Sequence, residues 1–216
     1  MGHRFEMTKY DAYLPIGNDC SPAYYLKACG LRTEAYPLDW MVFSAHAMIH
    51  LFQTGFSDFF SAVAEEKSSD ASPCRYIRDT ANDILSIHHF PKDRETADVL
   101  NEFHSKMRRR YLRLHDRLMH SGSLLMLGYR QDTEEHVKNT LLEFAAIYPH
   151  LSIHLINVRH MPEMVSNQLR RERHDLNAHL ALTLCYFNDR YDASSQKSFD
   201  IWGNEALWRR VLGEPG

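Results

Sequence analysis

Cys20 is the side chain whose setting in this sequence most favours chemistry. It follows a short apolar run and the break Gly17-Asn18-Asp19, and a helical pattern begins directly after it at Ser21-Pro22. Ser-Pro starts helices well, because the hydroxyl can cap free N–H groups and proline at the first helical position loses no hydrogen bond. Helix N-termini favour a thiolate over a thiol, and their N–H groups can bind an oxyanion. The turn therefore predicts either a nucleophilic Cys20 or a small buried residue that seals a strand-to-helix junction.

Two further segments offer groups that could act beside this cysteine. In Pro37-Leu38-Asp39-Trp40, the aspartate either caps the following helix while the tryptophan packs in the core, or it lines a pocket beside Cys20. His88 and His89 follow each other in an apolar run, and strand alternation would place them on opposite faces. We therefore expect only one of these two histidines to serve the site.

The other histidines indicate no particular chemistry. The chain has 14 of them but no HExxH pair, so we expect no metal site. His154 and His160, in and after an apolar run, stay open as alternative bases. In a parallel sheet, His160 would lie at the same carboxyl edge as Cys20.

Composition limits the class of protein. A length of 216 residues suits one sizeable α/β domain, and a formal net charge of -3 argues against bulk attraction to nucleic acid. The four cysteines form no CxxC pair, residues 1–10 do not resemble a signal peptide, and no apolar run has membrane-spanning length. We expect a cytoplasmic protein without a membrane span. Neither GxGxxG nor a phosphate loop occurs, so no cofactor is predicted. The oligomeric state is not predictable.

Apolar runs alternate with helical patterns along most of the chain. Runs that are apolar throughout, with helices between them, indicate a parallel sheet covered on both faces. We predict the α/β class: a single three-layer domain over residues 1–216, with a mostly parallel, Rossmann-like sheet. Residues 41–90 are expected to form an irregular helical and hairpin insertion. The expected strands are 12–16, 123–129, 151–158 and 179–187, the hairpin is 75–79 with 84–90, the helices are 22–29, 41–60, 91–120, 132–148 and 205–212, and 64–73 is a polar loop.

The N-terminal motifs resemble the opening of a known bacterial family. Ile16-Gly17-Asn18-Asp19-Cys20, the helix up to Gly30-Leu31-Arg32, and Pro37-Leu38-Asp39-Trp40 are similar to the family labelled "putative papain-like cysteine peptidase", a domain of unknown function. That family opens with a strand, a Gly-x-x-Cys turn, a helix and a Pro-Phe-Asp-Trp segment. Leu38 stands here in place of the phenylalanine, and Asn18-Asp19 in place of the commoner Ser-Asn.

The resemblance implies a cysteine nucleophile, then a histidine base, then an asparagine or aspartate that orients the base. Carried onto this sequence, the nucleophile is Cys20, the base is His89, and the third residue is Asp189 or Asn188. His89-Phe90 is similar to the family's His-Asp-aromatic segment, but without the aspartate. The residues expected to bind substrate are Gly17, Asn18, Asp19, Ser21, Asp39, Trp40, His88 and Asn188.

Three functions are weighed. The first is a cysteine-dependent hydrolase of the peptidase, amidase or acyl-transfer type, acting on a small-molecule, peptide or glycan substrate. The second is a sugar- or nucleotide-sugar-handling protein of polysaccharide biosynthesis. This function is suggested because members of the family that these motifs resemble occur beside glycan-synthesis proteins. There the turn would bind a phosphate or hydroxyl, and aromatic faces would stack on sugar. The third is a binding domain without catalysis.

Overall fold

The computed structural model describes residues 10–165, 167–192 and 197–213. In these residues it is a mixed α/β protein whose largest sheet has five strands in the order β1-β6-β7-β9-β8. Four of them are parallel: β1 (Ala12–Gly17), β6 (Ser123–Tyr129), β7 (Ser152–His160) and β9 (Leu180–Phe187). The predicted apolar runs are confirmed as these strands.

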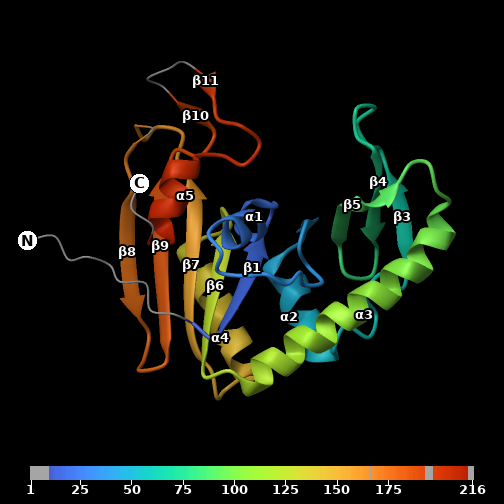
Figure 1. Ribbon diagram of the computed structural model, residues 1–216. Coiled ribbons are helices and arrows are strands. Elements are labelled where there is room, and N and C mark those ends of the chain that lie inside the picture. The colour runs from blue at the N-terminus through green and yellow to red at the C-terminus, as the bar shows by residue number, and fades with distance from the viewer. Residues whose placement is uncertain (1–9, 166, 193–196, 214–216) are drawn as a thin grey trace, which may run out of the picture.

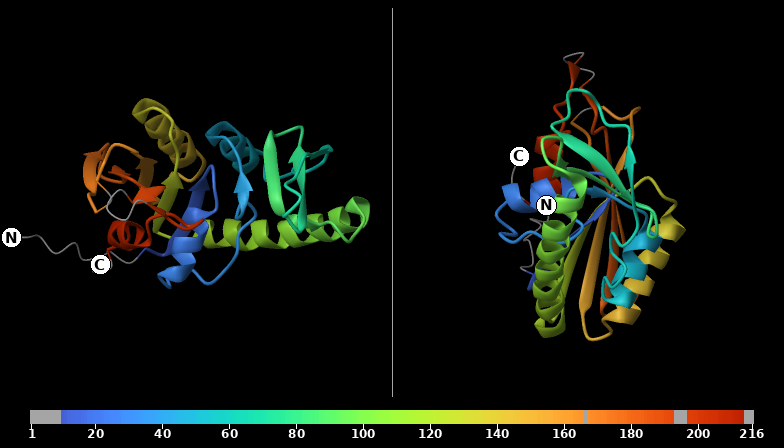
Figure 2. Two further views of the ribbon diagram at one scale, coloured as in Figure 1. Left: turned by 90° about the horizontal axis from the view of Figure 1, so that it is seen from above. Right: turned by 90° about the vertical axis from the view of Figure 1, so that its right-hand side faces the viewer.

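Helices cover both faces of this sheet (Figures 1 and 2). Alternate strand residues enter two separate apolar clusters, so that Tyr13 lies in one and Leu14 in the other. The Tyr13 cluster includes side chains of α1 (Ser21–Ala28) and α5 (Glu205–Val211). The Leu14 cluster includes side chains of α2 (Ala45–Thr54), α3 (Thr96–His120) and α4 (Glu134–Ile147). This two-sided burial explains why the parallel strands are apolar throughout.

The strand order does not establish Rossmann-like winding. Strands β1, β6, β7 and β9 follow one another across the sheet in a single direction. A doubly wound sheet reverses its strand order at a switch point, and these four strands contain no such reversal. The coarser expectation of an α/β fold with a mainly parallel sheet is confirmed, and the single domain over residues 1–216 stays a prediction.

The predicted irregular insertion contains a regular antiparallel sheet. Its order is β2-β5-β4-β3, and the expected hairpin is confirmed as β4 (Cys74–Asp79) with β5 (Ile84–Pro91). The helix expected over 41–60 is shorter, because Met41–Val42 is strand β2 and α2 ends at Thr54, where Gly55 takes a left-handed φ of 65°. The polar loop expected from residue 64 includes part of β3 (Val63–Glu66).

A charged strand closes one edge of the large sheet. Strand β8 (Arg170–Asp175) pairs antiparallel with β9 and has the sequence RRERHD. No strand is predicted here from the sequence, because the residues are charged rather than apolar. Charged edge strands resist pairing with other chains, which accounts for the composition. The two-stranded β10 (Tyr191–Asp192) and β11 (Lys197–Ser198) complete the elements.

Helix α3 connects the two sheets. In Figure 1 it runs from beside the second sheet to the foot of β6. The helix predicted over 91–120 is present from Thr96, and Phe103, Met107, Leu114 and Leu118 form its buried apolar stripe. Three arginines of its polar face donate to backbone carbonyls of the N-terminal segments, namely Arg110 to Tyr36, Arg113 to Ala35 and Arg117 to Asp11. Part of this basic face therefore fastens the segment that precedes Trp40. No helix among the described residues is long and apolar enough to cross a membrane.

The glycine at the end of β1 is required by close packing. A Cβ on Gly17 would lie 2.9 Å from both the backbone N and the backbone O of Tyr129, and the φ of Gly17 is +153°. Asn18 N–H then donates to Tyr129 O at 3.2 Å, which holds the turn against β6. The glycine of the Gly-x-x-Cys motif is thus explained by backbone contact.

We predict that Gly17→Ala lowers the free energy of unfolding by about 2 kcal/mol or more, because the new methyl group meets backbone that cannot rotate away. Gly30→Ala is the control. Its φ is also left-handed, but a Cβ there meets nothing within 4 Å, so it should cost only about 1 kcal/mol. Urea denaturation of both variants measures the difference, and equal losses would contradict the packing argument.

Candidate functional site

The turn that carries Cys20 is organised by Asp19. Cys20 occupies the N-cap position of α1 without a side-chain capping bond, and Asp19 Oδ1 accepts from Ser21 N at 2.9 Å. The expectation that the Ser21 hydroxyl caps this helix is wrong; Ser21 is buried, and the aspartate takes that role. Asp19 Oδ2 also pairs with Arg190 at 2.6 Å. Asn18 is the exposed residue of the turn.

The environment of Cys20 holds its thiol in the protonated form. Burial raises the pKa of Cys20 to about 12, and the negative charges of Asp19 and Asp39 add to that rise. The side chain is partly buried rather than sealed in the core. The positive end of α1 is therefore outweighed here, and Cys20 is a thiol that needs a base to become a nucleophile.

Asp39 is engaged in a buried ion pair. The two terminal guanidinium nitrogens of Arg32 contact its carboxylate, Nη1 at 3.0 Å from Oδ1 and Nη2 at 2.9 Å from Oδ2. Both side chains are nearly inaccessible to solvent. Asp39 Oδ2 also accepts from Tyr36 N at 2.9 Å. The carboxylate thus ties its own loop together rather than capping the next helix, where Ser44 Oγ accepts from Ala47 N.

Trp40 follows this ion pair in an unusual backbone conformation. Its φ is +66°, a left-handed value that is strained for a bulky side chain. The ring is only partly buried, in contrast to the expectation of a core residue. The neighbouring buried ion pair fixes the loop in which this conformation occurs.

Four rings form a continuous series from α1 to β5. Tyr24 stacks on Trp202 with centroids 4.2 Å apart, Trp202 contacts Trp40 edge-on at 5.8 Å, and Trp40 contacts His88 edge-on at 6.1 Å. Tyr24 is four residues after Cys20, so both lie on the same side of α1. The series therefore extends from the helix that carries the thiol to the strand that carries His88.

The two adjacent histidines of β5 have different surroundings. Three β5 residues between Ser86 and Phe90 face a single residue of β4, which is a bulge. His89 points toward α3, where its ring meets Phe103 and its Nδ1 lies 3.0 Å from Ser86 Oγ. Burial, helped by the positive charges nearby, lowers the pKa of His89 to about 3. His88 is exposed and contacts Trp40, and partial burial lowers its pKa as well.

Asp189 and Asn188 are buried structural groups at the end of β9. Asp189 Oδ1 accepts from Asn204 N at 2.8 Å and from Trp208 Nε1 at 2.9 Å, whereas its Oδ2 has no partner among the described residues. Burial raises the pKa of Asp189 to about 6. Asn188 accepts from Arg190 N and Tyr191 N and donates to the carbonyls of residues 162 and 164. The Asp189 side chain anchors the C-terminal segment, whereas the Asn188 side chain joins the segments that follow β7 and β9.

The alternative bases lie at opposite ends of β7. His154, the third residue of the strand, is buried between Tyr10 Oη and Thr183 Oγ1, and burial lowers its pKa to about 4. It is therefore far from the carboxyl edge where Cys20 lies. His160 ends the strand at that edge, as expected, but its Nδ1 accepts from Asp189 N at 3.1 Å.

The structure thus brings together only part of the predicted site. Asp19 and Asp39 lie close enough to Cys20 for their charges to act on its thiol, and Trp40 and His88 are connected to α1 through Trp202 and Tyr24. Among the described residues, no hydrogen bond joins Cys20, His89 and Asp189. Trp202 was expected to bind ligand beside Trp40 under the sugar-handling hypothesis. No sequence pattern assigned Tyr24, Arg32 or Arg190 a role in this region, because their contacts depend on residues distant in the chain. No cluster of three His, Cys, Asp or Glu side chains in the described part of the chain could hold a metal ion.

Comparison with known proteins identifies the family. A family model described as "Putative papain-like cysteine peptidase" matches residues 11–121, about half of the chain. The chain belongs to this family. The matched segment contains Cys20, Asp39, Trp40 and both adjacent histidines, and it excludes Asp189.

A curated relative covers a similar share of the chain. An uncharacterised protein of Acanthamoeba polyphaga mimivirus is 28% identical over a 138-residue alignment, and the alignment covers 56% of this chain and 61% of the viral protein. The alignment thus spans about three fifths of that relative. This relative is viral, so the bacterial origin expected from the resemblance stays a prediction. No solved structure matches significantly.

The raised pKa of Asp189 gives a prediction about stability and pH. The unfolded carboxyl has a pKa of 3.8 and the folded one about 6, so its contribution to stability is fully present below pH 3.8 and is lost as the pH rises through 6. Asp189→Asn can accept both hydrogen bonds without ionising. Relative to this variant, the wild type should gain up to about 3 kcal/mol of unfolding free energy between pH 7 and pH 4.

Urea titrations across that pH range measure the free energy of unfolding of both proteins. Taking the difference between them cancels the pH dependence that the histidines give to both. Exposed Asp93→Asn is the control and should show no such trend. A flat difference between wild type and Asp189→Asn would mean that Asp189 titrates normally.

Proposed function

We propose that this protein is a cysteine-dependent hydrolase of the peptidase, amidase or acyl-transfer type, with Cys20 as nucleophile and His88 as base. The observation that carries the proposal is the ring series from Tyr24 to His88. It extends from the helix of Cys20 to a titratable side chain, within the segment that matches the family. This placement favours His88 over His89, because the His89 ring packs against Phe103 of α3.

The protonation states suit general-base catalysis. The raised pKa of Cys20 leaves a thiol at neutral pH, and the lowered pKa of His88 leaves an imidazole that is neutral and able to accept a proton. In the first step His88 takes the thiol proton while Sγ bonds to the carbonyl carbon of an ester or amide. The proton then passes to the leaving group, and an acyl-thioester remains on Cys20. Water, deprotonated by the same imidazole, releases the acid and restores the thiol.

Other parts of the turn would stabilise charge and position substrate. The backbone N–H groups of the first turn of α1 and the exposed Asn18 amide are candidate donors to the oxyanion. Trp40 and Trp202 would hold a small-molecule, peptide or glycan substrate over the thiol. In this proposal Asp39 and Asp189 are positioning residues, because the first fixes the Trp40 loop and the second anchors the segment that carries Trp202.

The proposal predicts that Cys20 reacts with an acyl donor through His88. With p-nitrophenyl acetate as the probe, intact-protein mass spectrometry and peptide mapping should find acetyl on Cys20. His88→Ala should slow this acylation by about a hundredfold or more, since a positioned base contributes that much. His89→Ala, the neighbouring control, should change the rate far less. Acetylation of Cys20 no faster than that of Cys29 or Cys74, which are similarly exposed, would overturn the proposal.

A second candidate function is binding of a sugar or nucleotide sugar without use of the thiol. The specific observation in its favour is that the stacked Tyr24–Trp202 pair is only partly buried, beside a cysteine whose pKa is raised rather than lowered. Aromatic faces of this kind suit sugar rings, and Arg190 lies nearby through its pair with Asp19.

For this candidate we predict that Trp202→Ala abolishes stabilisation by a sugar nucleotide, whereas Cys20→Ala leaves it unchanged. Thermal shift with UDP-glucose and UDP-N-acetylglucosamine measures both variants against wild type. Wild-type protein whose melting temperature does not move with either compound would count against sugar-nucleotide binding. Loss of the shift in both variants would place the thiol in the binding site.

A further inference from the structure

A cavity of about 480 Å³ lies between α3 and the segment that follows α2. Its walls are largely apolar and aromatic: Phe56 and Phe59 come from that segment, and Met107, Tyr111 and Leu112 come from α3. The Phe56 ring lies 4.7 Å from the Tyr111 ring and 5.3 Å from the Phe59 ring. A volume of this size is typical of small-molecule sites.

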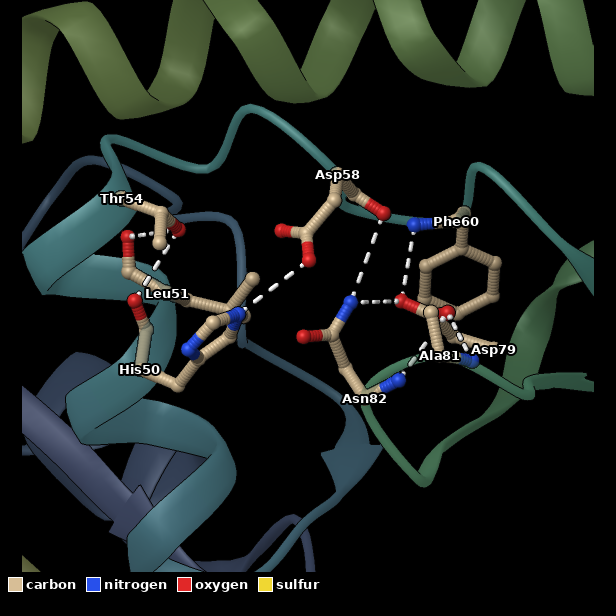
Figure 3. A network of polar contacts seen from close by, with 8 residues as sticks. All are labelled: His50, Leu51, Thr54, Asp58, Phe60, Asp79, Ala81 and Asn82. Atoms are coloured by element: carbon tan, nitrogen blue, oxygen red, sulfur yellow. Dashed lines mark hydrogen bonds and ion pairs between the residues drawn. The ribbon is translucent and has the colours of Figure 1, made fainter.

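The wall formed by the segment after α2 is held in place by buried polar contacts (Figure 3). Asp79 Oδ2 accepts from Phe60 N at 2.8 Å and from Asn82 Nδ2 at 2.8 Å, and the same Asn82 amide donates to the Asp58 carbonyl. Asp58 Oδ2 also contacts His50 Nε2 at 3.2 Å. Figure 3 shows these groups on the side of the segment that faces away from α3, so the network leaves the cavity side to apolar groups.

Backbone strain lies in the same segment. Phe56 and Phe60 have φ values of 59° and 56°, although neither is a glycine. Left-handed phenylalanine is unfavourable and persists only where surrounding contacts fix it. The hydrogen bond from Phe60 N to Asp79 supplies that constraint for Phe60, and Phe56 N donates to Leu51 O at 2.9 Å. Both ends of the cavity wall are therefore held by contacts within the protein.

The positive charge of Arg108 indicates which kind of ligand the cavity would bind. Of its ten lining residues, Arg108 alone carries a fixed charge. Among the described residues, no ion pair or hydrogen bond engages its guanidinium, whereas Arg110, Arg113 and Arg117 of the same helix contact backbone carbonyls. Leu112, beside it at the mouth, is 53% exposed. An apolar chamber with one unpaired cation at its mouth complements a molecule with an apolar tail and one anionic end.

We propose that this cavity binds a small amphipathic carboxylate, with the tail against the wall of Phe56, Phe59 and Tyr111 and the carboxylate on Arg108. None of the lining residues belongs to the Cys20 site, so the proposal is independent of the proposed hydrolase. Binding can be measured without any activity assay.

The test uses decanoate as the probe and decanol as its uncharged counterpart, with isothermal titration calorimetry on the full chain. Wild type should bind decanoate more tightly than decanol. Arg108→Gln should weaken decanoate binding at least about tenfold and leave decanol unchanged, because it removes one charge-assisted contact. Arg109→Gln changes the adjacent arginine, which does not line the cavity, and should have no effect.

A second pair of variants tests the location. Leu112→Glu places a negative charge at the mouth and should abolish decanoate binding. Met119→Glu, at a residue of the same helix that is 49% exposed and outside the cavity, should not. Both sites are exposed, so neither change threatens folding. Absence of decanoate binding to wild type, or equal weakening by the two arginine variants or by the two glutamate variants, would overturn the proposal.

Discussion

The buried ion pair between Arg32 and Asp39 is the interaction on which the candidate site depends. A carboxylate this inaccessible would be costly without its two guanidinium contacts and the Tyr36 N–H, so the three groups must be buried together. Their joint burial closes residues 32–39 into a rigid loop, and the next residue is the left-handed Trp40. Since the Trp40 ring contacts both Trp202 and His88, the ion pair sets the positions of groups that come from three distant parts of the chain. Arginines 110 and 113 of α3 add contacts to the same loop from outside.

The elements that the sequence revealed are those buried on both sides. The runs at 123–129, 152–158 and 180–187 are apolar at most positions on both faces because helices cover both faces of the large sheet, and such runs can be recognised without knowing their neighbours. The edge strand β8 could not be read in this way. Its residues are charged because one edge must resist further pairing, and that requirement exists only once β9 is in place. The second sheet was hidden for a related reason: β2 and β3 are short and partly exposed, so their pairing with the visible hairpin leaves little pattern in the sequence.

In the candidate site too, the features set by local sequence were predictable and those set by distant contacts were not. The Gly-x-x-Cys turn is local, so its glycine, its helix start and its cysteine could all be placed from the sequence. The choice between His88 and His89 could not, because it depends on a bulge between β4 and β5 and on Phe103 of α3, which the His89 ring contacts. Asp189 follows an apolar strand in the position of a ligand-binding residue. It instead accepts hydrogen bonds from Asn204 and Trp208 of the C-terminal segment. No pattern in the sequence predicts where that segment packs.

Asp19 shows how the turn can favour folding at the expense of a reactive thiol. The carboxylate caps α1 and pairs with Arg190, so it joins the turn after β1 to the segment after β9. Burial is the main reason that the pKa of the Cys20 thiol is raised, and the negative charge of Asp19 beside it adds to that rise, so the benefit of the helix N-terminus is outweighed. The setting of this turn therefore leaves a protonated thiol, which a base must activate. Because His88 reaches the region through Trp40, the chemistry proposed here depends on the loop that Arg32 and Asp39 close as much as on the cysteine itself.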